Sequence, residues 1–157
     1  MTALPTPSTV SARVCIDASL VLHFVLPDER DLPTEALWRQ WSTTGVRVIG
    51  PMLRYAEVTS VLRLRVATER LTADEGEAAF TAFNALGIAK VDRDDLHIRA
   101  WNLAQQFQTR RAYDMMYLAL AQLEDLELWT GDERLVNTVG GHDPRVKWVP
   151  ATGNATP

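Results

Sequence analysis

The stretch RVCIDASLVLHFVLP, at residues 13–27, indicates how the chain begins to fold. Residues 14–16 form a short apolar run of the kind found in a buried strand. The segment Leu20–Leu26 has helical spacing and stops at Pro27, a residue that the interior of a helix does not tolerate. The stretch therefore predicts a strand followed directly by a helix, with the acid Asp17 at the junction.

The same alternation of strand and helix runs through the rest of the chain. Further strands are expected at residues 46–49, 88–91, 127–130 and, at an edge, 146–149. Further helices are expected at residues 32–44, 51–69, 72–87, 93–108, 113–125 and 132–139. This order predicts right-handed crossovers and a parallel sheet covered on both faces, which is a three-layer α/β/α sandwich.

The size and composition of the chain indicate one globular domain. It has 157 residues, of which 46% are apolar and 23% charged, and these values are ordinary for a globular protein. We expect the domain to cover residues 13–149, with flexible ends at residues 1–12 and 150–157. Residues 1–12 lack the basic start and apolar core of a signal peptide. No apolar stretch is long enough to span a bilayer, and the single cysteine excludes an internal disulfide, so we expect a cytoplasmic protein without a membrane partner.

Four acids occupy positions that are unusual for a carboxylate, at the ends of strands or in line with apolar residues of a helix. Asp17 and Asp132 follow the first and fourth expected strands, while Glu57 and Asp114 lie early in their helices in line with apolar neighbours. That spacing predicts that both helical acids face the core. Strands of a parallel sheet end at a shared edge, where ligands bind if the strand order reverses. We therefore expect all four acids to project toward one edge of the sheet.

Three explanations compete for carboxylates in such surroundings. Arginine partners would pair Glu57 with Arg54, and Asp114 with Arg110 or Arg111. Helix capping would suit the two acids that follow strands. A shared divalent metal explains the whole set, because like charges held close together cannot all stay ionised without a cation. Hard oxygen ligands without accompanying histidine or cysteine indicate Mg²⁺, with Mn²⁺ as the second choice.

Four segments carry a resemblance to a known family. They are VCIDAS at residues 14–19, PMLRYAEV at 51–58, YDMMYLALA at 113–121 and WTGDERL at 129–135. In this order and spacing they resemble the motifs of PIN-domain ribonucleases, and more narrowly the VapC-type toxins of type II toxin–antitoxin pairs. The resemblance implies a metal-dependent endoribonuclease that hydrolyses RNA phosphodiester bonds through a metal-activated water. It also implies a homodimer and inhibition by a VapB-type antitoxin.

The resemblance also assigns roles to residues. The catalytic and metal-binding acids that it implies are Asp17, Glu57, Asp114 and Asp132. The supporting hydroxyls that it implies are those of Ser19 and Thr130. From the residues themselves, Arg110 and Arg111 are candidates for contact with RNA, because guanidinium groups suit phosphate and both precede the helix of Asp114.

Other functions are open at this point. Within the same fold, the chain could be a housekeeping RNA-processing nuclease. It could also be a catalytically silent PIN domain that binds RNA or a partner protein, but the complete set of four acids argues against a loss of catalytic activity. An aspartate-nucleophile phosphatase would also place Asp17 after a strand, but Ser19 stands where that chemistry needs a second acid. The three histidines lack the spacing of a zinc site.

The formal net charge of −4 at first speaks against a nucleic-acid partner, because phosphate binders usually carry a basic excess. The four site acids account for this charge, so the rest of the chain is formally neutral. Bound divalent metal would offset the acidic charge, whereas a metal-free site should repel an RNA backbone. We therefore expect RNA binding, as well as cleavage, to depend on the cation.

Overall fold

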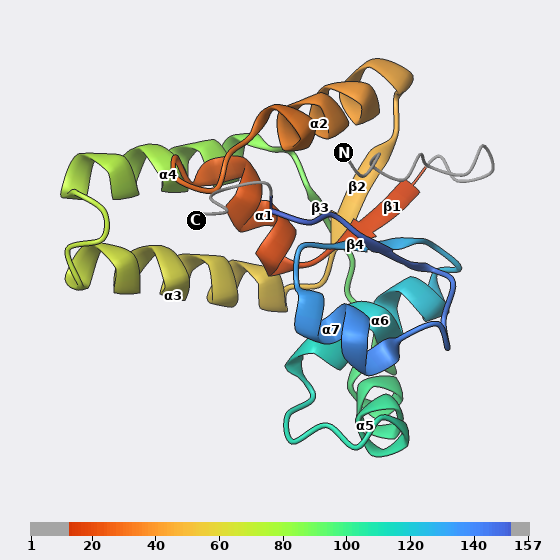
Figure 1. The fold of residues 1–157 in the computed structure, drawn as a ribbon. Coiled ribbons are helices and arrows are strands. Elements are labelled where there is room, and N and C mark those ends of the chain that lie inside the picture. The colour runs from red at the N-terminus through yellow and green to blue at the C-terminus, as the bar shows by residue number, and fades with distance from the viewer. Residues whose placement is uncertain (1–12, 152–157) are drawn as a thin grey trace, which may run out of the picture.

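The computed structural model describes residues 13–151, which form one parallel sheet and the helices that cover it (Figure 1). The strands are β1 (Arg13–Ile16), β2 (Arg47–Gly50), β3 (Ala89–Lys90), β4 (Leu128–Thr130) and β5 (Val146–Trp148). Their order in the sheet is β3-β2-β1-β4-β5, and each pair of neighbours is parallel. Of the ends expected to be flexible, residues 1–12 and 152–157 lie outside the described residues, whereas residues 150 and 151 are described.

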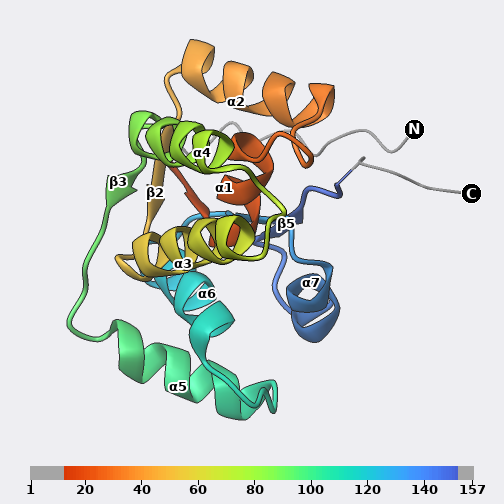
Figure 2. The ribbon, with the colours of Figure 1, turned by 90° about the vertical axis from the view of Figure 1, so that its left-hand side faces the viewer.

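The helices of the described residues lie on both sides of this sheet. They are α1 (Ala18–Val25), α2 (Leu32–Thr44), α3 (Leu53–Ala67), α4 (Ala73–Ala85), α5 (Leu96–Gln106), α6 (Tyr113–Leu123) and α7 (Glu133–Val139). Figures 1 and 2 show α1, α2 and α4 together on one side of the strands and α5, α6 and α7 on the other, with α3 alongside α4. The predicted three-layer sandwich is thus confirmed. None of these helices is long and apolar enough to cross a membrane.

The centre of the sheet decides where a site can form. Val14, Cys15 and Ile16 of β1 are fully buried, because this strand has β2 on one side and β4 on the other. From β1 the chain builds outward to β2 and β3, then returns across the sheet to β4, so the strand order reverses between β1 and β4. In sheets of this type, ligands bind beyond the carboxyl ends of the strands at such a reversal. Asp17 and Asp132 follow these two strands.

One helix begins later than the sequence suggests. The start of α5 expected at residue 93, for which Asp92 would be a suitable capping residue, is wrong, since the helix begins at Leu96. The carboxylate of Asp92 instead lies 3.3 Å from the ammonium group of Lys90. This ion pair turns the side chain of Asp92 toward the end of β3, so it does not serve as a helix cap.

Candidate active site

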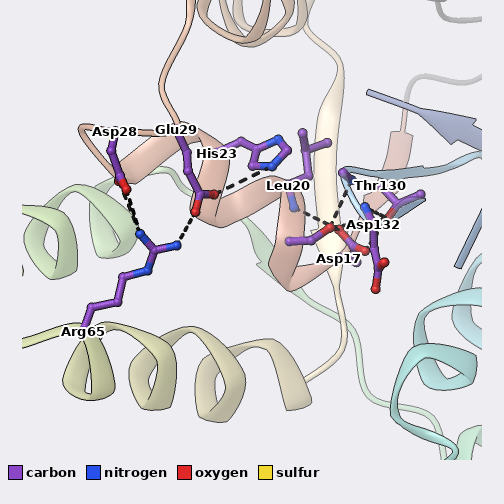
Figure 3. Close-up of polar contacts among 10 residues, drawn as sticks. Asp17, Leu20, His23, Asp28, Glu29, Arg65, Thr130 and Asp132 are labelled. Carbon is purple, nitrogen blue, oxygen red and sulfur yellow. Dashed lines mark hydrogen bonds and ion pairs between the residues drawn. The ribbon is translucent and has the colours of Figure 1, made fainter. Parts of the chain in front are cut away.

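Asp17 is the most buried acid of the site and has three hydrogen-bond donors around it (Figure 3). Its Oδ1 accepts from the Ser19 hydroxyl at 2.7 Å and from the Leu20 amide at 3.0 Å, while its Oδ2 accepts from the Thr130 hydroxyl at 2.5 Å. The bond to Leu20 makes Asp17 the N-cap of α1, as the capping explanation predicts. Burial and these bonds together hold the carboxylate in one orientation at the end of β1.

Two hydroxyls connect Asp17 to the loop that follows β4. The Thr130 hydroxyl, besides donating to Asp17, accepts from the amide of Asp132 at 2.9 Å. The Ser19 hydroxyl accepts from the amide of Gly131 at 3.0 Å. The two hydroxyls that were expected to support the site therefore contact both the carboxylate of Asp17 and the backbone at and before Asp132. Strands β1 and β4 are neighbours, which is why residues more than a hundred positions apart meet here.

Asp132 caps α7 and forms an ion pair with Arg134. Its Oδ1 accepts from the amide of Arg134 at 2.9 Å, and its Oδ2 lies 3.3 Å from the guanidinium group of the same arginine. The Arg134 side chain is largely exposed to solvent. An ion pair with so exposed a partner is weak, so the carboxylate of Asp132 can exchange this arginine for another cation.

Glu57 reaches the site from α3 and is half-buried. Its Oε2 accepts a hydrogen bond from the Tyr117 hydroxyl of α6. The arginine partner considered for it does something else, because the buried Arg54 guanidinium donates to backbone carbonyls and to one phenol oxygen. These acceptors belong to Gly50, Pro51, Ile88 and Tyr55. A tyrosine hydroxyl, rather than an arginine, is therefore the hydrogen-bond partner that the structure records for Glu57.

Asp114 is exposed, so the expectation that it faces the core is wrong. The buried face of α6 includes Met115 and Leu118, and Asp114 lies beside this face rather than on it. It lines a surface hollow together with three arginines, namely Arg110, Arg111 and Arg134. Neither of the first two forms an ion pair with Asp114, and it is the charge of Arg134 that favours its ionised form.

The four acids act on one another electrostatically. Burial raises the pKa of Asp17 from 3.8 to about 6, against the effect of its three hydrogen bonds, and the charge of Asp132 adds to this rise. The Asp114 residue as a whole is exposed, but partial burial of its carboxyl raises the pKa, and the charge of Asp132 raises it further. Burial also raises the pKa of Glu57, and Asp114 adds to that rise. Repulsion therefore acts between Asp132 and both Asp17 and Asp114, and between Asp114 and Glu57.

A divalent cation fits the chemistry of these donors. The side chains offer hard carboxylate oxygens, and a cation would relieve the repulsion that adds to the effect of burial on the pKa values of Asp17, Glu57 and Asp114. Within residues 13–151, no group of three or more histidine, cysteine or acidic side chains is already arranged to hold a metal ion. Asp17, Asp132 and Glu57 are instead held by hydroxyls, an arginine and a tyrosine. Metal binding would therefore draw these carboxylates toward a common point.

Comparison with known proteins gives the family. The family model described as the PIN domain matches residues 14–140, which is most of the chain. The chain belongs to the PIN domain family. The resemblance expected from the four sequence segments is therefore confirmed at the level of the family.

Individual relatives of this PIN domain include two mycobacterial proteins. The "VapC ribonuclease Mb0985" of Mycobacterium bovis and the "Ribonuclease VapC9" of Mycobacterium tuberculosis strain H37Rv are each 29% identical to this chain over 125 residues. Each match covers 80% of this chain and 90% of the relative.

Two solved structures share the fold. The protein PAE2754 from Pyrobaculum aerophilum superimposes with a TM-score of 0.62 at 18% identity, over 82% of this chain and 89% of that one. A toxin–antitoxin complex from Klebsiella pneumoniae contains a chain that superimposes with a TM-score of 0.58 at 17% identity. That match covers 85% of this chain and 94% of the other. At these identities the two structures support the PIN fold alone.

Two features of the PIN site were not anticipated. Tyr117 lies three positions after Asp114 on a buried helix, and this spacing could have suggested a shared face. His23 packs its ring against Gly131, so closely that a Cβ atom at Gly131 would collide with it. The His23 Nε2 atom in turn lies 3.7 Å from the carboxylate of Glu29, which pairs with Arg65 of α3 (Figure 3). No local pattern predicts the contact between His23 and Gly131, which depends on how α1 lies against β4.

This contact leads to a test of the loop between Thr130 and Asp132. We expect Gly131→Ala to lower the free energy of unfolding by about 1–3 kcal/mol, because the added methyl group overlaps the His23 ring. Urea denaturation of Gly131→Ala, His23→Ala and the double variant would measure it. The double variant should be more stable than the sum of the single effects predicts, since the smaller side chain makes room. Strict additivity would contradict the contact.

The raised pKa of Asp17 predicts how the metal-free protein responds to pH. A carboxyl whose pKa is higher in the folded state stabilises the fold while protonated, below about pH 4, and this contribution is lost as pH rises through about 6. A rise of the pKa from 3.8 to about 6 corresponds to roughly 3 kcal/mol. We expect the free energy of unfolding to fall by that order between pH 4 and pH 7.

Denaturation in the presence of a chelator measures this effect, with Asp17→Asn as the comparison. The variant lacks the titrating group, so its stability should change much less over the same pH range. Addition of Mg²⁺ at pH 8 should restore stability to the unsubstituted protein. If both proteins follow the same pH profile, the burial of a charged Asp17 does not limit stability.

Proposed function

We propose that this PIN domain is a metal-dependent endoribonuclease that acts as the toxin of a type II toxin–antitoxin pair in the cytoplasm. The observation that carries the proposal is the buried Asp17, which the hydroxyls of Ser19 and Thr130 hold beside Asp132 at the ends of β1 and β4. The electrostatic effect of Asp132 on Asp114, and of Asp114 on Glu57, supports the inclusion of the other two acids. The proposal is supported by the mycobacterial relatives, whose names describe VapC ribonucleases. A chain of the same fold occurs in a toxin–antitoxin complex, and we expect this chain to have an antitoxin partner, of the VapB type, as well.

The acids of the chain would hold the metal. Mg²⁺ is the first choice and Mn²⁺ the second, because the donors are carboxylate oxygens without histidine or cysteine. The residues that would hold it are Asp17, Glu57, Asp114 and Asp132. When bound, the metal supplies an activated water and neutralises charge on the phosphate oxygens.

Residues of the chain orient the acids and the attacking water. The hydroxyls of Ser19 and Thr130 orient Asp17, and the Thr130 hydroxyl also positions the backbone of Asp132. Glu57 has one oxygen bonded to Tyr117 and the other available, so it or Asp132 orients the attacking water. Hydrolysis of the phosphodiester then requires no histidine.

The RNA backbone would enter through the hollow beside Asp114. The guanidinium groups of Arg110 and Arg111 line it and have no ion-pair partner among residues 13–151, so they are available to phosphate oxygens. We expect the double variant Arg110→Gln, Arg111→Gln to raise KM roughly tenfold with kcat little changed, and to flatten the salt dependence of RNA binding. The matched control replaces Arg39 and Arg47, which are exposed elsewhere. An equal effect in the control would contradict this path.

Incubation of the purified protein with RNA tests the proposed function. We expect cleavage with Mg²⁺ or Mn²⁺ and none with EDTA, and a gel-shift assay should show that RNA binding also weakens without metal. Cleavage that EDTA leaves unchanged would contradict the mechanism. Binding without cleavage of any RNA would favour the silent PIN domain instead.

The partners can be tested separately. Sedimentation should show a homodimer. Co-expression with the product of a small adjacent reading frame that carries a DNA-binding segment should suppress both cleavage and growth arrest. If the chain cleaves RNA but no neighbouring gene product inhibits it, the housekeeping RNA-processing role becomes the better account.

A further inference from the structure

Tyr117 is a buried residue whose hydroxyl contacts an acid of the candidate site. The side chain is only 1% exposed, yet its hydroxyl reaches Glu57, which comes from a different helix. The same phenol also interacts electrostatically with Asp17 and with the buried Arg54. Tyr117 therefore lies among the acids of the site, although the packing of α6 alone would need only an apolar ring there.

Toward Glu57, the Tyr117 hydroxyl acts as a hydrogen-bond donor. A carboxylate can only accept, so the Tyr117 hydroxyl is the donor in its hydrogen bond with Glu57. A phenol has a single proton to donate, and this one goes to Oε2 of Glu57. No other hydrogen bond to the Glu57 side chain is found among the described residues, which leaves its Oε1 without a protein donor.

We propose that Tyr117 is a positioning residue that holds Oε2 of Glu57 and thereby presents Oε1 to the divalent cation or to the attacking water. The proposal rests on the proposed function. Outer partners of metal-binding carboxylates orient them in this way, and their loss lowers metal affinity or activity. Glu57 needs such a partner because it lies on a helix surface and is only half-buried, so its side chain would otherwise sample several rotamers.

The variant Tyr117→Phe tests the proposal, because it removes the hydroxyl and keeps the ring. We expect its affinity for Mn²⁺, measured by titration calorimetry, to fall roughly 10- to 100-fold. The kcat for RNA cleavage should fall to a similar extent, with KM unchanged. The matched control is Tyr113→Phe on the same helix, whose exposed hydroxyl has no hydrogen-bond partner among residues 13–151. This control should behave like the unsubstituted protein.

A double-mutant cycle separates positioning from a purely structural role. In metal-free protein, the effects of Tyr117→Phe and Glu57→Ala on the melting temperature should be non-additive, because both remove the same hydrogen bond. Additive effects would overturn the proposal. So would non-additivity combined with unchanged Mn²⁺ affinity, or loss of the fold in Tyr117→Phe, since either result assigns the hydroxyl to stability alone.

The same experiment distinguishes this proposal from the proposed function. If the unsubstituted protein binds Mn²⁺ but cleaves no RNA, the nuclease assignment fails while the calorimetry still decides the role of Tyr117. If it cleaves RNA and Tyr117→Phe is unaffected, only the role of Tyr117 fails. If it binds no divalent cation at all, both are overturned.

Discussion

Asp17→Asn is expected to lower kcat for RNA cleavage by roughly 10³-fold. A catalytic metal supplies several kcal/mol of transition-state stabilisation, and each 1.4 kcal/mol corresponds to a factor of ten in rate. Asp17 is the acid most constrained in the site, with two hydroxyls and one amide directed at its carboxylate. An amide in its place keeps the shape and removes the negative charge that would bind the cation.

The same substitution should stabilise the metal-free protein. The charge of Asp17 is buried, has no arginine or lysine paired with it in the described structure, and is repelled by Asp132. Asparagine can still accept from the Leu20 amide, because its carbonyl oxygen can take the position of Oδ1. We expect the free energy of unfolding at pH 8 to rise by about 1 kcal/mol or more. Loss of activity with a gain of stability would mark Asp17 as a functional residue.

The control for this prediction is Asp31→Asn. Asp31 caps α2 as Asp17 caps α1, and it accepts from the Thr34 amide at 2.8 Å. The two substitutions are chemically identical and affect the same kind of helix cap, but Asp31 is not one of the site acids. Steady-state cleavage and urea denaturation of both variants should therefore differ. If Asp17→Asn retains more than a tenth of the activity, or is less stable than the unsubstituted protein, the prediction is wrong.

Local signals in the sequence predicted some elements to the residue. The helix α2 spans Leu32–Thr44 as expected, because Asp31 caps its start, Pro33 fits its first turn and Gly45 ends it with a φ of 72°. The start of α5 could not be predicted from capping, because Asp92 pairs with Lys90, and Asp95, directly before the helix, pairs with Arg93 and makes no side-chain cap. Boundaries set by a capping side chain could thus be predicted, and this boundary, which has none, could not.

The candidate site divides in a similar way. The approach of Asp17 to Thr130 could be inferred, because both follow or end strands that become neighbours at the reversal of strand order. The side chains that surround Glu57 and Asp114 could not be inferred from the sequence, because they depend on how α3 and α6 are rotated about their axes. A rotation of that kind places Asp114 beside the buried face rather than on it, and brings the Tyr117 hydroxyl to Glu57.

Arg54 shows how strongly tertiary structure can redirect a residue. Its guanidinium group is fully buried and donates to the carbonyls of Gly50, Pro51 and Ile88 at 2.8, 3.1 and 2.6 Å. It also lies 4.3 Å from the ring of Tyr55, in a cation–π contact. These contacts join the end of β2 to the residue before β3. Because β3 is only two residues long, this arginine supplies attachment that the strand's own ladder does not.

We expect Arg54→Met to lower the free energy of unfolding by about 4 kcal/mol. Three charge-assisted hydrogen bonds to carbonyls are lost, at about 1.5 kcal/mol each, and a domain of this size has only about 5–15 kcal/mol to lose. Arg54→Lys should recover only part of this, since an ammonium group cannot reach the carbonyls of Gly50 and Ile88 at once as the planar fork does. Urea denaturation measures both, with Arg63→Met, at an exposed position on the same helix, as the control. A stability for Arg54→Met close to that of the control would mean that the β2–β3 edge holds without the arginine. Metal affinity should fall with stability, because the helix that Arg54 anchors is the one that carries Glu57.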